Sequence, residues 1–74
     1  MYHDSTYAET CELHCTDKDQ SIDSEVLNFH PGKYLDVSVN RELKIQLKYN
    51  KHHDLYIGAK AGLEFTTIGP KQFK

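Results

Sequence analysis

The chain has 74 residues, of which 38% are hydrophobic and 27% are charged, and it contains no tryptophan. A chain of this length forms one small domain that buries only about 60% of its unfolded surface. Its content of aromatic and apolar residues indicates a folded domain and excludes a wholly disordered one. We expect a flexible N-terminus over residues 1–6, a single β-rich domain over residues 7–69 and a C-terminal tail over residues 70–74.

The N-terminus lacks the basic and apolar regions of a secretory signal, and no apolar run is long enough to span a membrane. Two cysteines are too few for a disulfide scaffold. These features predict a cytoplasmic protein with reduced thiols and no membrane partner.

Charge is divided unevenly along the chain. Residues 1–32 hold seven acids and one base, a net charge of −6, whereas residues 33–74 hold eight bases and four acids, a net charge of +4. Such polarity can steer a charged partner. It can also serve the fold by placing an acidic strand beside a basic one, which is the interpretation we favour.

The first half of the chain contains one segment that alternates apolar and polar residues and one that is ambiguous. Alternation over residues 7–15 predicts a strand, and the polar segment 16–20 predicts a turn. Residues 21–30 fit either a short helix near 22–29, capped by Ser21, or a strand. Either element ends at the Pro-Gly pair that follows.

The second half reads more clearly as strands. Residues 34–39 and 41–50 alternate regularly and are joined by a tight turn. Residues 55–68 fit either one long bent strand, with Leu55 and Ile57 on the same face, or a hairpin, which Gly58 and Gly62 favour. We expect a mainly β fold, a small antiparallel sheet or partly open barrel of about four to six strands.

Cys11, His14 and Cys15 are candidate ligands for a zinc ion, with a further histidine as the fourth ligand. In a strand, however, the two cysteines lie about 13 Å apart, too far for one metal or for a disulfide, and His14 faces the opposite side. We therefore expect two buried core thiols, no metal and no cofactor. A zinc-stabilised domain is the third functional hypothesis.

A basic outward face on the strand over residues 41–50 is the candidate binding site. Bases with interleaved aromatic rings suit single-stranded RNA or DNA, and a basic face or an unpaired edge strand can equally engage a protein. The leading hypothesis is a small regulatory or accessory module that binds another protein, and the alternative is a nucleic-acid-binding protein. The expected partner-binding residues are Arg41, Lys44, Gln46, Lys48 and Lys51, with Tyr34, Tyr56 and Lys60 on the same surface.

Catalytic motifs are absent from the sequence: there is no Gly-rich phosphate loop, G-x-S-x-G elbow or H-E-x-x-H. We therefore expect a protein that is not an enzyme. His52-His53-Asp54 fits a solvated turn better than a titrating or metal-binding site.

Residues 56–65 resemble the last strand of PilZ-type cyclic-dinucleotide barrels, but the paired-arginine motif of that family is absent, since Arg41 is the only arginine. No nucleotide site follows from the resemblance.

Overall fold

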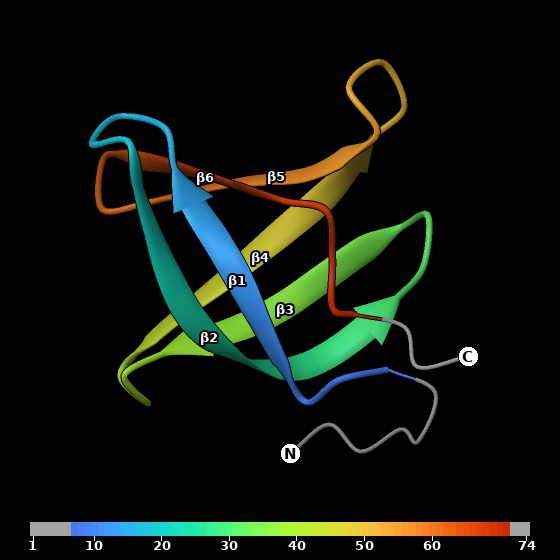
Figure 1. The fold of residues 1–74 in the computed structure, drawn as a ribbon, viewed down its shortest axis with the longest axis horizontal. Helices are drawn as coiled ribbons and strands as arrows, with labels where there is room; N and C mark the ends of the chain where they lie inside the picture. Colours follow the sequence, from blue (N-terminus) through green and yellow to red (C-terminus); the bar gives the residue numbers. More distant parts are fainter. Residues whose placement is uncertain (1–6, 72–74) are drawn as a thin grey trace.

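A computed structural model describes residues 7–71 and shows a small closed antiparallel barrel (Figure 1). Each strand pairs with the next in chain order, and the last pairs with the first. The predicted mainly β, single-domain fold is confirmed, whereas the expected N-terminal segment and the end of the expected tail lie outside the described residues. The strands are β1 (Thr10–Cys15), β2 (Gln20–His30), β3 (Tyr34–Val39), β4 (Leu43–Asn50), β5 (Leu55–Lys60) and β6 (Leu63–Thr67).

Residues 20–30 form a strand, so the helix considered for residues 22–29 is wrong. A β-bulge between Val26 and Asn28 shifts the register against β3. Ser24 and Val26 face inward before the bulge, and Phe29 faces inward after it. One extra residue in a strand moves all later side chains to the other face, and the resulting spacing of inward residues resembles that of a helix face.

The hairpin predicted within residues 55–68 is confirmed. Ala61 and Gly62 connect β5 to β6, with φ of 54° and 77° respectively. Positive φ at both central residues is the geometry of a two-residue hairpin turn of type I′, whose twist matches that of the flanking strands.

The inward side of β5 is the side that carries Tyr56. Tyr56 is buried, whereas Leu55 and Ile57 lie half-buried on the outside. Gly58 shares the inward side with Tyr56, and a Cβ atom there would come within 2.6 Å of the Gln46 carbonyl oxygen. The close approach of β4 and β5 therefore requires a glycine at position 58.

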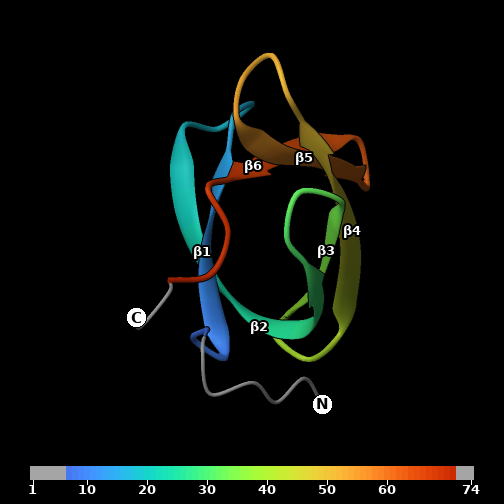
Figure 2. The ribbon, with the colours of Figure 1, turned by 90° about the vertical axis from the view of Figure 1, so that its right-hand side faces the viewer.

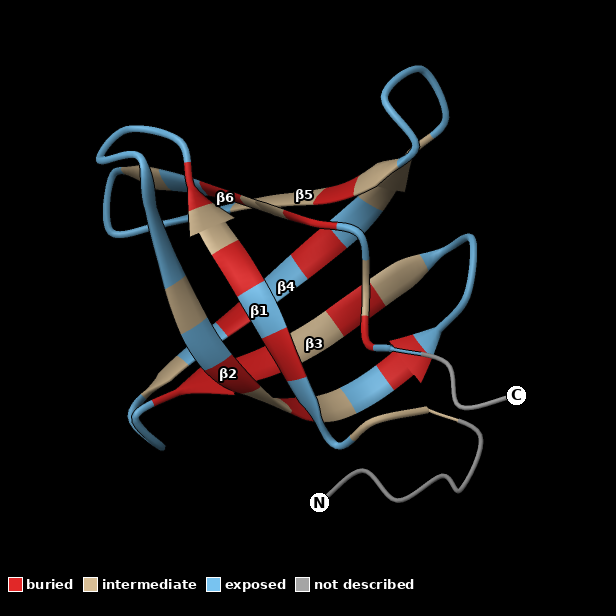
Figure 3. Ribbon diagram, in the orientation of Figure 1, coloured by how far each residue is buried: buried red, intermediate tan, exposed pale blue. Residues whose placement is uncertain are grey.

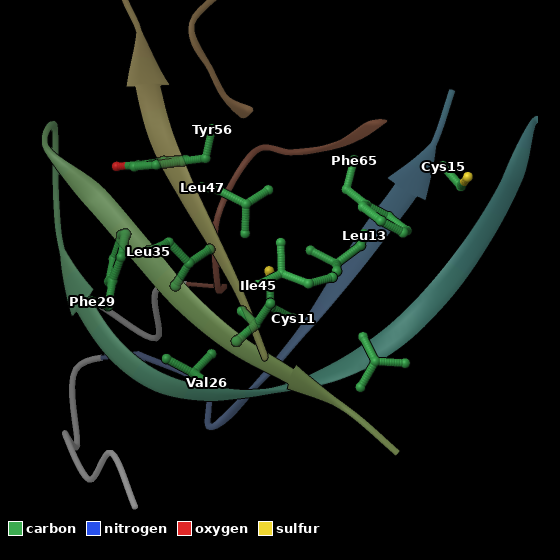
Figure 4. Close-up of a cluster of buried hydrophobic side chains, with 12 residues drawn as sticks. Cys11, Leu13, Cys15, Val26, Phe29, Leu35, Ile45, Leu47, Tyr56 and Phe65 are labelled. Atoms are coloured by element: carbon green, nitrogen blue, oxygen red, sulfur yellow. The ribbon is translucent and has the colours of Figure 1, made fainter. Parts of the chain in front are cut away.

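Aliphatic and aromatic side chains from all six strands fill the barrel (Figure 4), and Figure 3 shows where buried residues lie along the strands. Aromatic rings gather at one end, where Phe29 lies 4.9 Å from Tyr7 and 5.6 Å from Tyr56 between ring centroids. Figure 2 shows β1 on one side of the interior, β3 and β4 on the other, and the long strand β2 curving beneath it from one side to the other. The buried hydrophobic residues are Cys11, Leu13, Cys15, Val26, Phe29, Leu35, Val37, Val39, Ile45, Leu47, Tyr56 and Phe65.

The hydrogen-bonded ladders between neighbouring strands of the barrel differ in length. β3 and β4 are joined over six residue pairs, β4 and β5 over three, and β6 and β1 over two. Closure pairs the strands that would be edges of an open sheet. The described strands therefore include no wholly unpaired edge strand, so the edge-strand binding mode considered from the sequence has no free edge to use.

Candidate functional site

The register between β3 and β4 builds the expected basic face. Lys44, Gln46 and Lys48 are exposed, and the core residues between them are buried, as the alternation along β4 shows (Figure 3). On β3 their cross-strand neighbours are Ser38, Asp36 and Tyr34, in that order. The predicted outward placement of these three β4 side chains is confirmed.

Tyr34 lies on the same face, directly opposite Lys48. Its ring is tilted against that of His30 at a centroid distance of 4.6 Å, and its hydroxyl accepts a hydrogen bond from the Asn28 amide at 3.4 Å. The structure thus brings one aromatic pair next to one lysine of the face.

Tyr56 does not belong to this face, and its expected placement there is wrong. Its side chain points into the barrel (Figure 4). The backbone N–H of Gly32 donates a hydrogen bond of 2.8 Å to the Tyr56 hydroxyl, and the ring packs against Phe29 and Tyr49. A tyrosine is stable at such a barrel end because its ring is buried while its hydroxyl has a partner.

Three further predicted residues surround the face. Arg41 lies in the β3–β4 turn, is 88% exposed, and has its Nε 3.5 Å from Glu25 Oε1. Lys51 follows the far end of β4, in the turn to β5. Lys60 is exposed at the end of β5, across a groove from Lys44.

A groove of about 400 Å³ opens between β4 and the end of β5. It forms because the β4–β5 ladder ends at the pair Lys48↔Ile57, beyond which the strands are no longer paired. Among the described residues, no carboxylate lies within salt-bridge distance of Lys44 or Lys60. This β4–β5 groove is lined by Leu27, Asp36, Lys44, Ile45, Gln46, Ala59 and Lys60.

The charge asymmetry of the sequence appears as two faces of the barrel. On β1 and β2, Glu12 lies directly opposite Asp23, and Glu25 is opposite Thr10, so this face is acidic. β3 separates it from the basic residues of β4. The favoured interpretation, an acidic strand directly beside a basic one, is therefore limited to the Arg41–Glu25 ion pair.

The candidate zinc ligands do not converge. Cys11 and Cys15 are buried free thiols, which confirms their role as core residues, whereas His14 lies on the outer face, 3.5 Å from Asp19. Among the described residues no cluster of three or more ligating side chains is placed to hold a metal. Burial raises the pKa of the Cys11 thiol, an effect partly opposed by its hydrogen bond with Thr67.

The β4–β5 turn is organised by its own polar groups. The Asn50 side-chain oxygen accepts hydrogen bonds from the backbone N–H groups of His52 and His53, at 2.9 and 3.2 Å. Tyr49 donates its hydroxyl hydrogen to Asp54 Oδ1 at 2.6 Å, and this bond raises the pKa of Tyr49. Asp54 therefore stabilises the turn, and both histidines are exposed beside it.

Sequence reasoning missed two features of the outer surface. Leu27, at the β2 bulge, lines the β4–β5 groove, and a bulge leaves little trace in a sequence. Leu55 and Ile57 face outward; Gly58, inside an apolar run, was the signal that could have indicated this, because a glycine in a strand often marks a close backbone approach.

Fold and surface together define a small closed β-barrel with one basic and one acidic face. No protein-family model, curated protein or solved structure matches the chain. None of the described residues belongs to a helix that is long and apolar enough to cross a membrane. The function must therefore be inferred from the residues themselves.

Proposed function

We propose that this protein is a small non-enzymatic binding module that engages an acidic segment of another protein through the outer face of β4. The observation that carries the proposal is the β4–β5 groove, with Lys44 on one side and Lys60 on the other. Neither ammonium group is within salt-bridge distance of a carboxylate of the described chain. Both are therefore available to a carboxylate of a partner.

The groove adds an apolar contribution to this electrostatic one. Leu27 and Ala59 are apolar residues of its lining, and burying an apolar partner side chain there supplies affinity that exposed lysines alone do not. Its volume of about 400 Å³ is within the usual range of ligand-sized pockets, about 300–1,000 Å³. An acidic segment that carries one aliphatic side chain matches this lining.

Lys48 and Lys51 extend the positive surface beyond the groove, whereas Arg41 is ion-paired with Glu25. Exposed charges of this kind mainly accelerate association and select against basic partners. Asp36 lies inside the groove and lowers its positive potential, so the expected partner is acidic without being densely charged. A regulatory or accessory role in the cytoplasm fits such binding and belongs to the same proposal.

Single-stranded nucleic acid is the second candidate, supported by the His30–Tyr34 ring pair beside Lys48. Base stacking on aromatic rings next to a lysine is a common mode of such binding. The burial of Tyr56 removes one of the two expected stacking rings, and Asp36, the cross-strand neighbour of Gln46, adds a negative charge that repels phosphates. The protein partner is therefore favoured.

Affinity capture from a nuclease-treated lysate tests the proposal. The bait proteins are the wild type, the variant Lys44→Glu/Lys48→Glu, and the control Lys18→Glu/Lys71→Glu, which has the same change in charge away from the face. The expected result is a set of acidic proteins retained by wild type and control but lost from the first variant. Equal recovery by all three baits would refute the face, and recovery that disappears with nuclease would favour nucleic acid.

A further inference from the structure

A second pocket, of about 390 Å³, opens on the outside of the barrel where β2 passes the β3–β4 turn (Figure 1). It shares no lining residue with the β4–β5 groove, so its role is separate from the proposed function. Every residue that lines it is polar or charged. A ligand of this pocket must therefore be held by hydrogen bonds and charge rather than by apolar contact.

Ser38 is a buried polar residue whose hydroxyl opens into this pocket. The buried polar residues of the described chain are Ser24, Ser38 and Thr67. The Ser24 hydroxyl donates to the Cys11 carbonyl oxygen at 2.7 Å, and the Thr67 hydroxyl to the Glu12 carbonyl oxygen at 2.8 Å. The Ser38 hydroxyl has no such partner among the described residues, although Ser38 is only 6% exposed. Because no side-chain polar atom of the described chain is fully enclosed without a partner, this hydroxyl reaches the pocket, where a ligand can complete its hydrogen bonding.

The carboxylates of the pocket lie on β2. Asp23 and Glu25 share the outer face of that strand and are about 7 Å apart along it. Asp23 has no ion-pair partner among the described residues and lies directly opposite Glu12. Like charges in that position destabilise an antiparallel pair, and a cation bound beside Asp23 relieves the repulsion. The site therefore favours a positively charged ligand.

Two cations of the chain lie near the pocket, and neither neutralises Asp23. The Arg41 side chain is 88% exposed, with its Nε 3.5 Å from Glu25 Oε1, and so exposed an ion pair contributes little and opens readily to a competing cation. Lys44 lines the β4–β5 groove and not this pocket. Even with Lys44 counted, the carboxylates of Asp23, Glu25 and Glu12 outnumber the cations.

We propose that this pocket binds the arginine side chain of a basic segment of a partner protein. Its acceptors are the carboxylates of Asp23 and Glu25 and the hydroxyl of Ser38. A guanidinium group is planar and carries five N–H donors in a fixed fork, so it donates to several acceptors at once, whereas the lysine ammonium is a compact charge with three donors. Acceptors spread over two strands match the guanidinium better.

Nuclear magnetic resonance titration of the isotope-labelled full chain tests the choice of ligand. The probe is a short glycine-serine peptide with a single arginine, and it should shift the amide signals of Asp23, Glu25 and Ser38. The same peptide with lysine should bind at least about threefold more weakly, and with citrulline, which is neutral and nearly isosteric, it should not bind. Equal binding of the citrulline peptide, or no shift at these positions with about 10 mM arginine peptide, would overturn the proposal.

Substitutions test the assigned residues. Asp23→Asn, at an exposed position that tolerates the change, and Ser38→Ala should each weaken binding of the arginine peptide at least about fivefold. Arg41→Gln should strengthen it, because a competing cation is removed, and a purely structural role of Arg41 predicts no such gain. Asp19→Asn, the same change of charge in the β1–β2 turn, is the control and should leave binding unchanged. Wild-type binding by both Asp23→Asn and Ser38→Ala, or weaker binding by Arg41→Gln, would refute the site. Because the probe is basic, failure here leaves the acidic-segment proposal for the β4 face untouched.

Discussion

The substitution Gly58→Ala adds a single methyl group where β4 and β5 pack closely, and it tests how tightly these two strands are packed. The φ of Gly58 is outside the positive range, so alanine meets no backbone strain there and by itself gains about 0.4–1 kcal/mol from the unfolded state. The new Cβ, however, would lie 2.6 Å from the Gln46 carbonyl oxygen and 3.1 Å from Leu47 Cγ. The oxygen belongs to the backbone of β4 and cannot rotate away, so β4 and β5 must separate.

Overpacking of this kind costs about 1–3 kcal/mol, and we therefore expect Gly58→Ala to lose about 1–2 kcal/mol of unfolding free energy. Urea denaturation followed by circular dichroism measures this loss. Gly62→Ala is the control, because it has open space around it but a φ of +77°. Asparagine should separate the two causes: it is tolerated at positive φ, so it should do better than alanine at position 62 and worse than alanine at position 58. A Gly58→Ala protein as stable as the wild type would refute the reasoning.

Three further predictions concern the turn, the acidic face and the core thiol. Ala61 has a φ of 54° in the hairpin turn, so Ala61→Asn should raise the unfolding free energy by about 1 kcal/mol; a loss of stability in urea would contradict the turn assignment. Glu12 directly opposes Asp23, so Glu12→Lys should stabilise the fold by about 0.2–1 kcal/mol, and added salt should shrink the gain; a salt-independent effect would point to another cause. Burial raises the pKa of Cys11 above its ordinary value of 9.0, so its stabilising contribution is complete below pH 9.0 and is lost as the pH rises through the folded-state pKa. Urea midpoints measured between about pH 8 and 10.5 should therefore fall less steeply in Cys11→Ala than in the wild type, and identical slopes would contradict this role of the thiol.

The parts of the fold that sequence reasoning captured are those in which each strand keeps one regular alternation. β4 is the clearest case, because Lys44, Gln46 and Lys48 alternate with residues that one continuous core buries. Where the pattern misled, a backbone irregularity was the cause. The bulge next to Leu27 produced a helix-like spacing, and the close approach of β4 leaves no room for a side chain at Gly58, whereas Leu55 and Ile57 lie on the outer side of β5.

In the candidate site, too, the sequence predicts one part and not the other. The basic side chains of β4 could be predicted because they share one strand, and strand geometry alone places them on one face. The groove could not be predicted, because it depends on where the β4–β5 ladder ends and on the position of Lys60 across that gap. Those are properties of the tertiary arrangement, which also brings Leu27 of β2 to the same groove.

The binding role of the β4 face is the central claim, and nuclear magnetic resonance titration tests it most directly. Isotope-labelled protein is titrated with an acidic peptide that contains a single leucine, with a basic peptide of the same length, and with an oligothymidine strand. We predict that the acidic peptide alone shifts the amide signals of Lys44, Gln46, Ala59 and Lys60, and that Lys44→Glu/Lys48→Glu abolishes these shifts. Shifts confined to other strands, or the same shifts from the oligothymidine and none from the acidic peptide, would contradict the account.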